Sequence, residues 1–409
     1  MSSSGIDARA EQIGAHPVSR NVLSTYQQVA KHPNGGFMVP AGYNVQSKQK
    51  AIVRQAPITA LSGSSFLNGS SLDFKLDRSH LSIFTNAYIQ VKISNSTGGS
   101  ITLAPTPFWV DRIEIQGPGG QILTMIRGQE LFLTLSAFLS RNEFEQMAPH
   151  MCLSTAYATT GTVLANGASD AYYIPLFHLF SACKLHLDGL AGDFTVRILT
   201  QSSTYTLLAG THPTVSDVAL IMKGFNESSD MRAERKSTYH SRWPLKLPFI
   251  NIIRHLDNQT LAASTQYSTL LSTLRGTFVG IFITVRAAAI TATNQGNYQA
   301  LTSFDLQLAS GESLLGHYVR LDEDNKLECA ELFNNLFAVN KDAYFISFSS
   351  DPVLDCMTGS VHGYQVFSGA EKLQFSTPST LSGGSYIIDV YGLSAEHCHI
   401  QNGQLVVKK

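Results

Sequence analysis

The sequence predicts an all-β protein of two tandem eight-stranded jelly rolls (a double jelly roll), with short helices in the loops and an N-terminal arm. Three observations lead to this prediction. Short segments that alternate apolar and polar residues are separated by turns rich in Gly, Asn and Ser. An ordered set of segments in the first half recurs in the second half. The length of 409 residues suits two domains of about 150–200 residues each.

The clearest recurrence relates residues 108–132, FWVDRIEIQGPGGQILTMIRGQELF, to residues 304–333, FDLQLASGESLLGHYVRLDEDNKLECAELF. Both segments contain an alternating strand, a Gly-containing turn, a second apolar pair and a Glu-Leu-Phe triplet that begins a helix-like run. The glycines of 117–120 lack the trailing Gly-Lys-Ser/Thr of a phosphate-binding loop. We therefore expect 117–120 to be a hairpin turn.

Two more echoes follow in the same order. Residues 170–174 (DAYYI) return as 342–346 (DAYFI). Residues 184–187, followed by 194–198, return as 372–375, followed by 386–390. Any one echo could arise by chance, but four in one order, with the Glu-Leu-Phe triplet counted separately, predict two copies of one β module.

The expected strands are short, two to eight residues between turn-rich segments, a spacing that favours a jelly roll over a propeller or a solenoid. They are 72–76, 87–93, 113–116, 122–123, 172–176, 184–187, 194–199 and 218–222, then 270–274, 278–285, 303–308, 344–348, 363–367, 373–375, 386–392 and 404–407. Pro175 predicts a strand end or a sheet edge there. Apolar residues at helical spacing predict a helix over 129–147, and one or two helical turns are expected over 328–337. A long exposed loop is expected over 154–169.

The predicted domain organisation is an arm over 1–50, a first jelly roll over 51–225, a linker over 226–237 and a second jelly roll over 238–409. The linker, NESSDMRAERKS, is the most charged stretch of the chain and has no apolar core. The arm lacks strand alternation and is basic, because six cations up to Arg54 stand against Asp7 and Glu11, a local charge of +4. The candidate contact residues of the arm are Arg9, Arg20, Lys31, Lys48 and Lys50.

A basic arm with apolar residues at helical spacing could lie on an acidic surface such as a membrane or nucleic acid. It could equally pack on a neighbouring subunit or remain a flexible tail. The net charge of −1 gives the whole molecule no attraction to nucleic acid. Charged residues make up only 14% of the chain, which indicates that much of the outer surface is covered, most simply by further copies, or that the surface is made polar by Ser, Thr, Asn and Gln, and the two interpretations are compatible.

The sequence contains no catalytic motif that we can identify. His397 and His399 would share one face of a strand and could supply two ligands to a metal, but no further Cys or His pair completes a site. The five cysteines are scattered and never spaced as Cys-x-x-Cys, so we expect no obligatory disulfide. We therefore predict no cofactor, no metal and no enzymatic activity, and a structural or binding role instead.

Taken together, the chain from about residue 51 resembles the double jelly-roll major capsid proteins of tailless icosahedral DNA viruses, the tectivirus–adenovirus lineage. The resemblance rests on the Ile-x-Ile, Gly-Gly-Gln and apolar pair of 108–123, and on 172–176. The ending is also similar, in residues 372–376, 388–392 and 400–403. The chain lacks the large inserted towers of the bigger relatives.

This resemblance implies a pseudo-hexagonal homotrimer whose copies tile an icosahedral shell around an internal membrane. The implied partners are neighbouring capsid trimers and penton or minor capsid proteins, with no specific nucleic acid. The arm would face the inside of the shell, towards the membrane or adjacent trimers. The implied location is the virion capsid, assembled in the cytoplasm of the host cell.

Two alternatives from other classes stay open. A carbohydrate- or receptor-binding β-sandwich, such as a viral spike, would carry exposed aromatic platforms, and Trp109 and Trp243 are the only tryptophans. A two-domain cupin enzyme would need His-x-His followed by a Glu and a later His. The one His-x-His here, 397–399, lies ten residues from the C-terminus with no later His.

Overall fold

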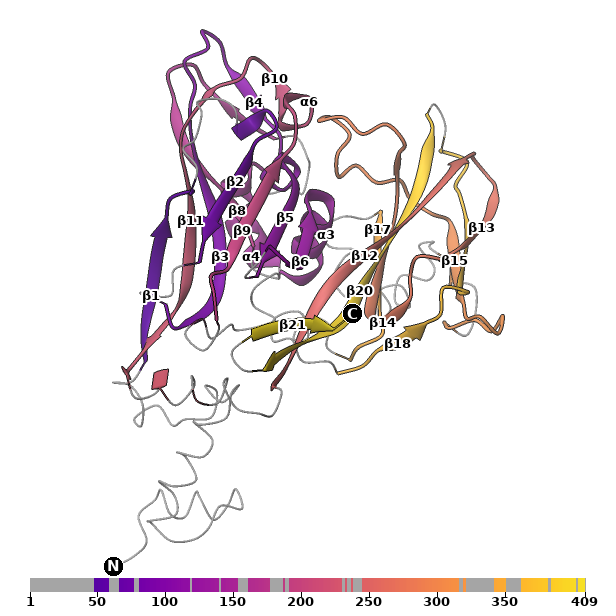
Figure 1. The fold of residues 1–409 in the computed structure, drawn as a ribbon. Helices are drawn as coiled ribbons and strands as arrows, with labels where there is room; N and C mark the ends of the chain where they lie inside the picture. The colour runs from indigo at the N-terminus through magenta and orange to yellow at the C-terminus, as the bar shows by residue number, and fades with distance from the viewer. Residues whose placement is uncertain are drawn as a thin grey trace, which may run out of the picture.

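The structure is a computed structural model, and only part of the chain is described below. The described residues are 48–58, 66–76, 81–117, 120–139, 141–153, 161–176, 187, 191–229, 232–233, 237, 245–315, 319–320, 342–350, 362–381, 384–401 and 404–408. Two groups of antiparallel strands stand side by side (Figure 1).

The first group forms two four-stranded sheets. One has the order β1 (Lys48–Gln55), β11 (Thr214–Glu227), β3 (Ile83–Ser94) and β8 (Ser169–Pro175). The other has the order β2 (Ser71–Lys75), β9 (Thr195–Thr200), β5 (Val110–Gln116) and β6 (Ile122–Arg127). A small third sheet joins β10 (Leu207–Ala209), β4 (Ile101–Leu103) and β7 (Thr162–Leu164).

The second group repeats this plan. One sheet has the order β12 (Leu245–Leu261), β20 (Tyr386–Gln401), β14 (Gly276–Ala287) and β17 (Ala343–Ser347). The other has the order β13 (Gln266–Leu270), β19 (Lys372–Ser376), β15 (Ser303–Gln307) and β16 (Val319–Arg320). Two further strands extend the first of these sheets, β18 (Gln365–Phe367) beside β14 and β21 (Gln404–Lys408) beside β20.

The order of the strands makes each group a jelly roll. With the eight main strands of each group numbered along the chain, one sheet has the order 1-8-3-6 and the other has the order 2-7-4-5. The same two orders occur in both groups, so the predicted double jelly roll is confirmed in the described part of the chain. We call the sheet with order 1-8-3-6 the lateral sheet of its jelly roll.

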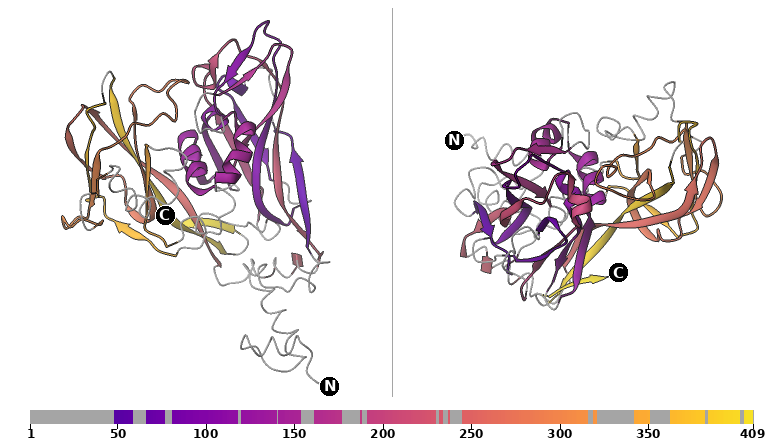
Figure 2. Two further views of the ribbon diagram at one scale, coloured as in Figure 1. Left: turned by 180° about the vertical axis from the view of Figure 1, so that it is seen from behind. Right: turned by 90° about the horizontal axis from the view of Figure 1, so that it is seen from above.

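Helices lie in the connections of the first jelly roll. They are η3 (Thr106–Trp109), α3 (Gly128–Phe138), α4 (Arg141–Met147), η4 (Ala148–Met151) and α6 (Ser203–Thr206). The views from behind and from above place α3 and α4 beside the strands of the first jelly roll, on the side of the second (Figure 2). The helix expected over 129–147 is thus two helices, α3 and α4.

Each jelly roll has an apolar interior set by strand alternation. On β3, for example, Ile89, Val91 and Ile93 are buried between the sheets, whereas Lys92 is exposed. The second interior is a separate cluster that includes Phe304. Alternation of this kind is the signal from which the sequence predicted the strands, and it is the physical reason that they pair face to face.

The hairpin turns of 117–121 and 308–312 are closed by the same hydrogen bonds. In each, the N–H of the first residue donates to the carbonyl oxygen of the fifth, at 2.8 Å, and the N–H of the fourth donates to the carbonyl oxygen of the first, at 3.1 and 2.9 Å. The fourth residue is Gly120 or Gly311, with φ of 81° and 88°. A glycine at this place in a tight hairpin forms a bulge that other residues strain to adopt. The echo predicted from these glycines is confirmed.

The last echo is displaced by one strand. Residues 194–198 fall on β9, the seventh strand of the first jelly roll, and its equivalent is β19. Residues 386–390 fall on β20, which is instead the equivalent of β11. The displacement has a physical cause, because neighbouring buried strands share one period and one small set of apolar residues. Of residues 184–187, only Leu187 is described.

Several expected boundaries also differ. Lys48 and Lys50, assigned to the arm, lie on β1, which pairs along its whole length with β11. The loop expected over 154–169 contains β7, and the strand expected over 270–274 is β13, which ends at Leu270. Pro175 is the last residue of β8, an edge strand, as expected. The helix expected over 328–337 and the rest of the arm lie outside the described residues.

The hairpin glycines provide a test of the repeat. Gly120→Ala and Gly311→Ala should each lower the free energy of unfolding by about 1 kcal/mol, because an L-residue is strained at positive φ. A Cβ at either position would meet no atom within 4 Å, so the cost is conformational alone. Urea denaturation followed by circular dichroism measures it.

The matched control is Gly99→Ala, since Gly99 is also exposed, has open space around its Cβ position and has no positive φ. It should be neutral or slightly stabilising. Equal stability of all three variants would contradict the bulge geometry.

Candidate functional site: the junction between the jelly rolls

The lateral sheet of the second jelly roll packs against the first jelly roll. One continuous apolar cluster extends from the interior of the first jelly roll to residues on the outer face of that sheet. These residues are Ile252, Val279, Phe282, Ala343, Phe345, Tyr391 and Leu393. In Figure 1, α3 and β6 lie between the two groups of strands at this junction. The outer face of the second lateral sheet is therefore an interior surface of the chain.

The helix α3 is held at its start by a short sequence of specific residues. The Glu130 carboxylate accepts hydrogen bonds from the backbone N–H of Arg127, at 2.8 Å, and from its guanidinium, at 3.0 Å. Gly128 has no room for a side chain, because a Cβ would come within 2.3 Å of the Pro107 carbonyl oxygen. Residues 130–136 are all buried, so α3 has no solvent face along that stretch. A helix buried on every side needs cover from both jelly rolls.

A charge cluster lies in the same junction. The carboxylate of Asp389 on β20 is fully buried. Its Oδ2 accepts hydrogen bonds from Arg254 Nη2 on β12, at 2.8 Å, and from Arg286 Nε on β14, at 2.5 Å. The Tyr391 hydroxyl lies 3.1 Å from Asp389 Oδ2 and 3.1 Å from Gln129 Oε1 on α3, so its single proton is shared between the two jelly rolls.

The surroundings perturb the pKa values in this cluster. Burial raises the pKa of Tyr391 well above its usual value, which keeps the hydroxyl protonated as a donor. Burial also raises the pKa of Glu130, although the hydrogen bonds from Arg127 oppose the shift. Burial alone would lower the pKa of Arg254, but its interactions with Tyr391 and Asp389 raise it overall. The cluster is therefore an ionic network with Asp389 as its central acceptor.

A polar cleft of about 250 Å³ opens beside the cluster. Residues of both jelly rolls line it, including Asp111, Arg127, Gln129, Tyr205, Arg254 and Gln295. Two hydrogen bonds bridge it, one from Gln295 Nε2 to the Tyr205 carbonyl oxygen at 3.0 Å and one from the N–H of Ala292 to the Thr204 carbonyl oxygen at 3.3 Å. Acidic and basic side chains balance along its walls, so the cleft selects neither anions nor cations. The junction thus joins the two jelly rolls by apolar contacts and by hydrogen bonds that cross between them.

The residues predicted to be functional do not gather in this junction. Arg9, Arg20 and Lys31 lie outside the described residues, and Lys48 and Lys50 lie on β1. His397 and His399 occupy alternate positions of β20, opposite residues of β12 and β21.

No metal centre or membrane span emerges from the part of the chain that is described. Within it, no three His, Cys, Asp or Glu residues come together as a metal site requires. Within the same residues, no helix is long and apolar enough to cross a membrane. Cys152 is buried and is not in a disulfide.

The sequence analysis did not single out the members of the charge cluster, although a signal for them exists. Asp389 stands alone among Ile387, Ile388 and Val390, and Arg286 ends the long apolar run of 278–285. An isolated charge within an apolar strand indicates a buried, paired group. The pairing of Asp389 with Arg254 and Arg286 could not be predicted, because β20 is more than ninety residues from β12 and β14 in the sequence.

The cluster can be tested by removing its central charge. Asp389→Asn leaves two poorly exposed guanidiniums without their carboxylate, and breaking a buried ion pair in this way costs about 3–5 kcal/mol of stability. The measurement is the urea midpoint of the purified protein. Asp193→Asn removes the partner of Lys75 in an exposed salt bridge and is the matched control. That change should cost about 1 kcal/mol or less. Similar losses in both variants would show that the buried cluster contributes no more to stability than an exposed ion pair.

Comparison with known proteins places this geometry in a known fold. No protein-family model and no curated protein matches the sequence. Among solved structures, the chain is similar to a capsid protein of the PBCV-1 virus, with a TM-score of 0.65 and 12% identity over 89% of this chain and 97% of that chain. The PBCV-1 protein VP54, fitted into a reconstruction of the virophage Sputnik, gives a TM-score of 0.66 and 13% identity over 88% and 97%.

The Faustovirus major capsid protein gives a TM-score of 0.59 and 10% identity over 98% of this chain and 97% of that chain. The similarity thus spans nearly all of both chains, although few residues are identical. It includes both jelly rolls. The chain therefore has the double jelly-roll fold of viral major capsid proteins.

Proposed function

We propose that this chain is a viral major capsid protein, a structural subunit and not an enzyme. The observation that carries the proposal is the rigid pair of equivalent jelly rolls, whose fold is that of capsid proteins over 88–98% of this chain. Two similar jelly rolls in one chain suit a trimeric capsid subunit, because three such chains can form a ring of six similar jelly rolls.

The proposed assembly is a pseudo-hexagonal homotrimer that tiles an icosahedral shell. The domains of the proposal are jelly rolls over 51–225 and 238–409, joined by 226–237, with β1 extending the first jelly roll back to residue 48. Neighbouring trimers and penton or minor capsid proteins would be the lateral partners. The location would be the virion capsid, assembled in the host cytoplasm.

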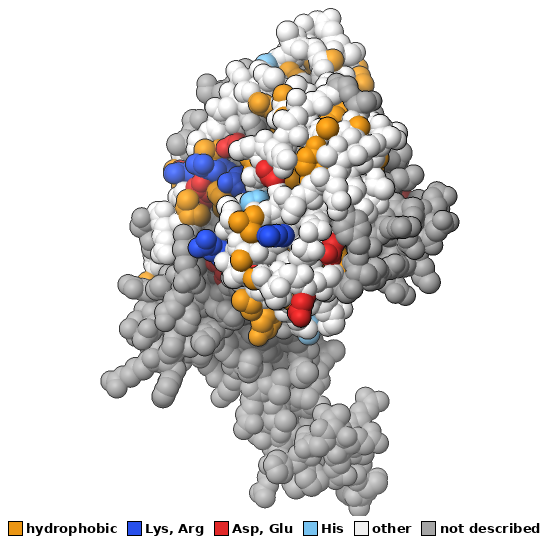
Figure 3. Space-filling view, turned by 90° about the vertical axis from the view of Figure 1, so that its right-hand side faces the viewer, with side chains coloured by type: hydrophobic (Ala, Val, Ile, Leu, Met, Phe, Trp, Pro, Cys, Tyr) orange, Lys and Arg blue, Asp and Glu red, His pale blue; other side chains and the backbone are white. Residues whose placement is uncertain are grey.

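The surface suits extensive lateral contacts. In Figure 3 uncharged polar side chains and backbone dominate the face, with small scattered groups of charged and hydrophobic residues. Charged residues make up only 14% of the chain. Large interfaces between copies are depleted in charge at their centres, so such a surface costs little to desolvate.

The alternative of a ligand-binding β-sandwich is less well supported. An aromatic platform requires an exposed ring, but Trp109 is fully buried and its Nε1 donates a hydrogen bond to the Ala104 carbonyl oxygen at 2.7 Å. The ring packs edge-on against Tyr172, with centroids 6.0 Å apart. Trp109 is thus a core residue of the first jelly roll.

The assembly itself is the first test. At micromolar concentration the purified chain should have the mass of a trimer by light scattering, and negative-stain images should show hexagonal outlines. A monomer without such outlines would overturn the proposal.

The arm provides a second test. Deletion of residues 1–47 leaves every paired residue of β1 in place, so the trimer should persist. We expect the deletion to impair shell formation or binding to anionic vesicles, which the triple change of Arg9, Arg20 and Lys31 to Gln should reproduce. Flotation with vesicles and electron microscopy of assemblies are the measurements. Loss of the trimer would instead place the arm in the subunit interface.

A further inference from the structure

We propose that the junction contains a binding site for one structural water molecule, held by Asp389 Oδ1, the Tyr298 hydroxyl and Arg254 Nε. The water supplies the hydrogen bonds that these three buried atoms do not obtain from the described part of the protein. The site lies within one chain, so it does not depend on the assembly proposed above.

The two oxygens of the Asp389 carboxylate are used unequally. Oδ2 accepts hydrogen bonds from Arg254 and Arg286 and lies 3.1 Å from the Tyr391 hydroxyl. Oδ1 is buried and accepts no hydrogen bond from any residue that the structure describes. A carboxylate oxygen that is buried without a donor is strongly unfavourable. Oδ1 therefore requires a donor that is not one of these side chains.

The Tyr298 hydroxyl is a second buried group without a partner among the described residues. The Tyr298 side chain is 5% exposed and belongs to the apolar cluster that crosses the junction. Burial raises the pKa of Tyr298, and the negative charge of Asp389 raises it further, so the hydroxyl keeps its proton. A protonated hydroxyl that is buried needs an acceptor.

Strand register places Tyr298 on the face that carries the carboxylate. An isolated antiparallel bridge joins Val285 of β14 to Gln299, so the preceding residue, Tyr298, lies beside the following residue, Arg286. Arg286 in turn is bonded through Nε to Asp389. Since alternate residues of a strand share one face, Tyr298, Arg286 and Asp389 lie on the same side of the sheet. This is the side that packs against the first jelly roll.

Arg254 supplies the third atom of the site. Its Nη2 is bonded to Asp389 Oδ2 at 2.8 Å, but its Nε is buried and has no acceptor among the described residues. Every N–H of a guanidinium is a donor, so Nε also needs an acceptor. Arg254 lines the polar cleft of about 250 Å³, which is several times the volume of about 30 Å³ that one water occupies in the liquid. The cleft is the side from which water reaches the cluster.

Water fits the three atoms because it both donates and accepts hydrogen bonds. It donates one to Asp389 Oδ1 and accepts one each from the Tyr298 hydroxyl and Arg254 Nε. Three hydrogen bonds are the usual number for a buried water. A cation could not accept the two donated protons, and an anion would be repelled by Asp389. The three atoms together thus select an uncharged molecule that is both donor and acceptor.

The water fastens one connecting segment to the sheet beneath it. Residues 288–302, between β14 and β15, contain Tyr298 and extend towards α6 of the first jelly roll (Figure 1). There the N–H of Ala292 donates to the Thr204 carbonyl oxygen at 3.3 Å. The segment is therefore bonded to the first jelly roll near its start and, through the water, to β20 near its end.

An experimental structure of the full-length protein, at a resolution that shows ordered waters, tests the site directly. A peak should lie about 2.5–3.2 Å from Asp389 Oδ1, from the Tyr298 hydroxyl and from Arg254 Nε. Well-defined side chains with no peak between them would overturn the proposal. A peak at about 2.0–2.4 Å from Oδ1 would also overturn it, because such distances indicate a metal cation.

The variant Tyr298→Phe tests the same site in solution. It removes one of the three partners of the water and leaves the ring in place. The folding equilibrium constant should fall about tenfold, because a hydrogen bond within a buried polar network is lost. Urea denaturation followed by circular dichroism measures the change.

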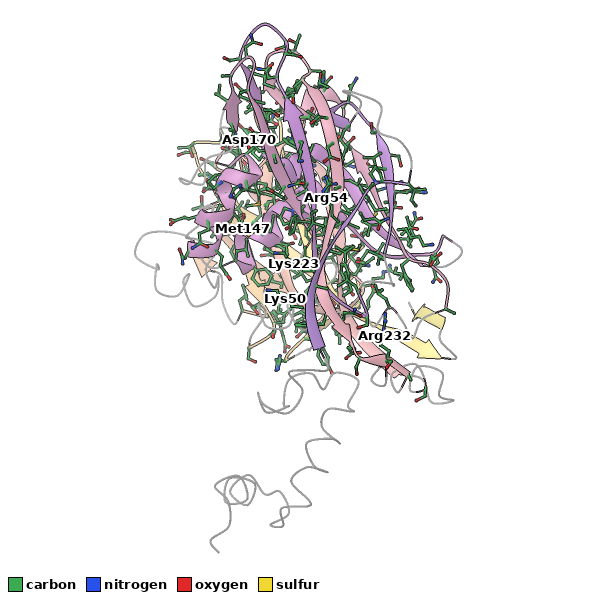
Figure 4. The ribbon with its side chains drawn as sticks, turned by 90° about the vertical axis from the view of Figure 1, so that its left-hand side faces the viewer. Lys50, Arg54, Met147, Asp170, Lys223 and Arg232 are labelled. Carbon is green, nitrogen blue, oxygen red and sulfur yellow. The ribbon has the colours of Figure 1, made fainter. Side chains whose placement is uncertain are left out.

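The matched control is Tyr172→Phe. The Tyr172 hydroxyl is also buried without a partner among the described residues. Tyr172 is distant from the junction, since Asp170 on the same strand, β8, lies on the side that faces away from the second jelly roll (Figure 4). Removal of this hydroxyl should leave the folding equilibrium constant unchanged or raise it, because no hydrogen bond is lost.

The comparison of the two variants decides the role of Tyr298. If Tyr298→Phe is as stable as the wild type, or more stable, its hydroxyl has no partner and the proposed site is wrong. Equal losses in the two variants would also contradict the proposal, because the effect would not depend on Asp389. Neither outcome bears on the capsid function, which the oligomeric state tests separately.

Discussion

One buried negative charge, Asp389, lies where the two jelly rolls meet, and the polar groups of the contact are arranged around it. Apolar contact between them would be favourable in many orientations, because the hydrophobic effect has no direction. The Asp389 carboxylate is different, since it must remain hydrogen-bonded to Arg254 and Arg286 and, through Tyr391, to Gln129 of the other jelly roll. The ion pairs themselves lie within the second jelly roll, so displacement of one jelly roll would break the hydrogen bonds that cross the junction, from Tyr391 to Gln129 and from Gln295 to the Tyr205 carbonyl oxygen. These directional bonds favour one orientation of an otherwise nonspecific apolar contact.

Duplication explains why such a network could arise on this face. Both jelly rolls place a carboxylate on the last strand between cations on the first and third strands. In one copy the cluster is hydrated and its ion pairs contribute little stability. In the other copy the cluster is buried away from water, where the geometry of the ion pairs matters more. The two clusters differ in detail, because Lys92 lies directly opposite Asp217, whereas Thr284 lies opposite Asp389 and Arg286 is two residues further along β14.

Much of the fold was predictable from local patterns, and much of the junction was not. Alternation predicted strands such as β3 and β14, and Gly120 and Gly311 identified the repeated hairpin because positive φ favours glycine. The junction depends on residues from strands that are distant in sequence, 135 positions apart for Arg254 and Asp389. The alternation of apolar and polar residues within one strand does not indicate which residue of a distant strand lies beside it. The start of β1 was assigned to the arm, because Lys48 and Lys50 resemble a basic tail in the sequence. Only the pairing with β11 shows that they belong to a strand.

The complete burial of α3 has a consequence for the order in which the chain can mature. Residues 128–138 are synthesised more than a hundred positions before the strands of the second lateral sheet that complete their cover. A chain that has formed only its first half exposes an apolar helix face to water, and such a species is prone to aggregate. The residues of that face include Leu131, Phe132, Leu133 and Leu135, which are buried in the complete fold.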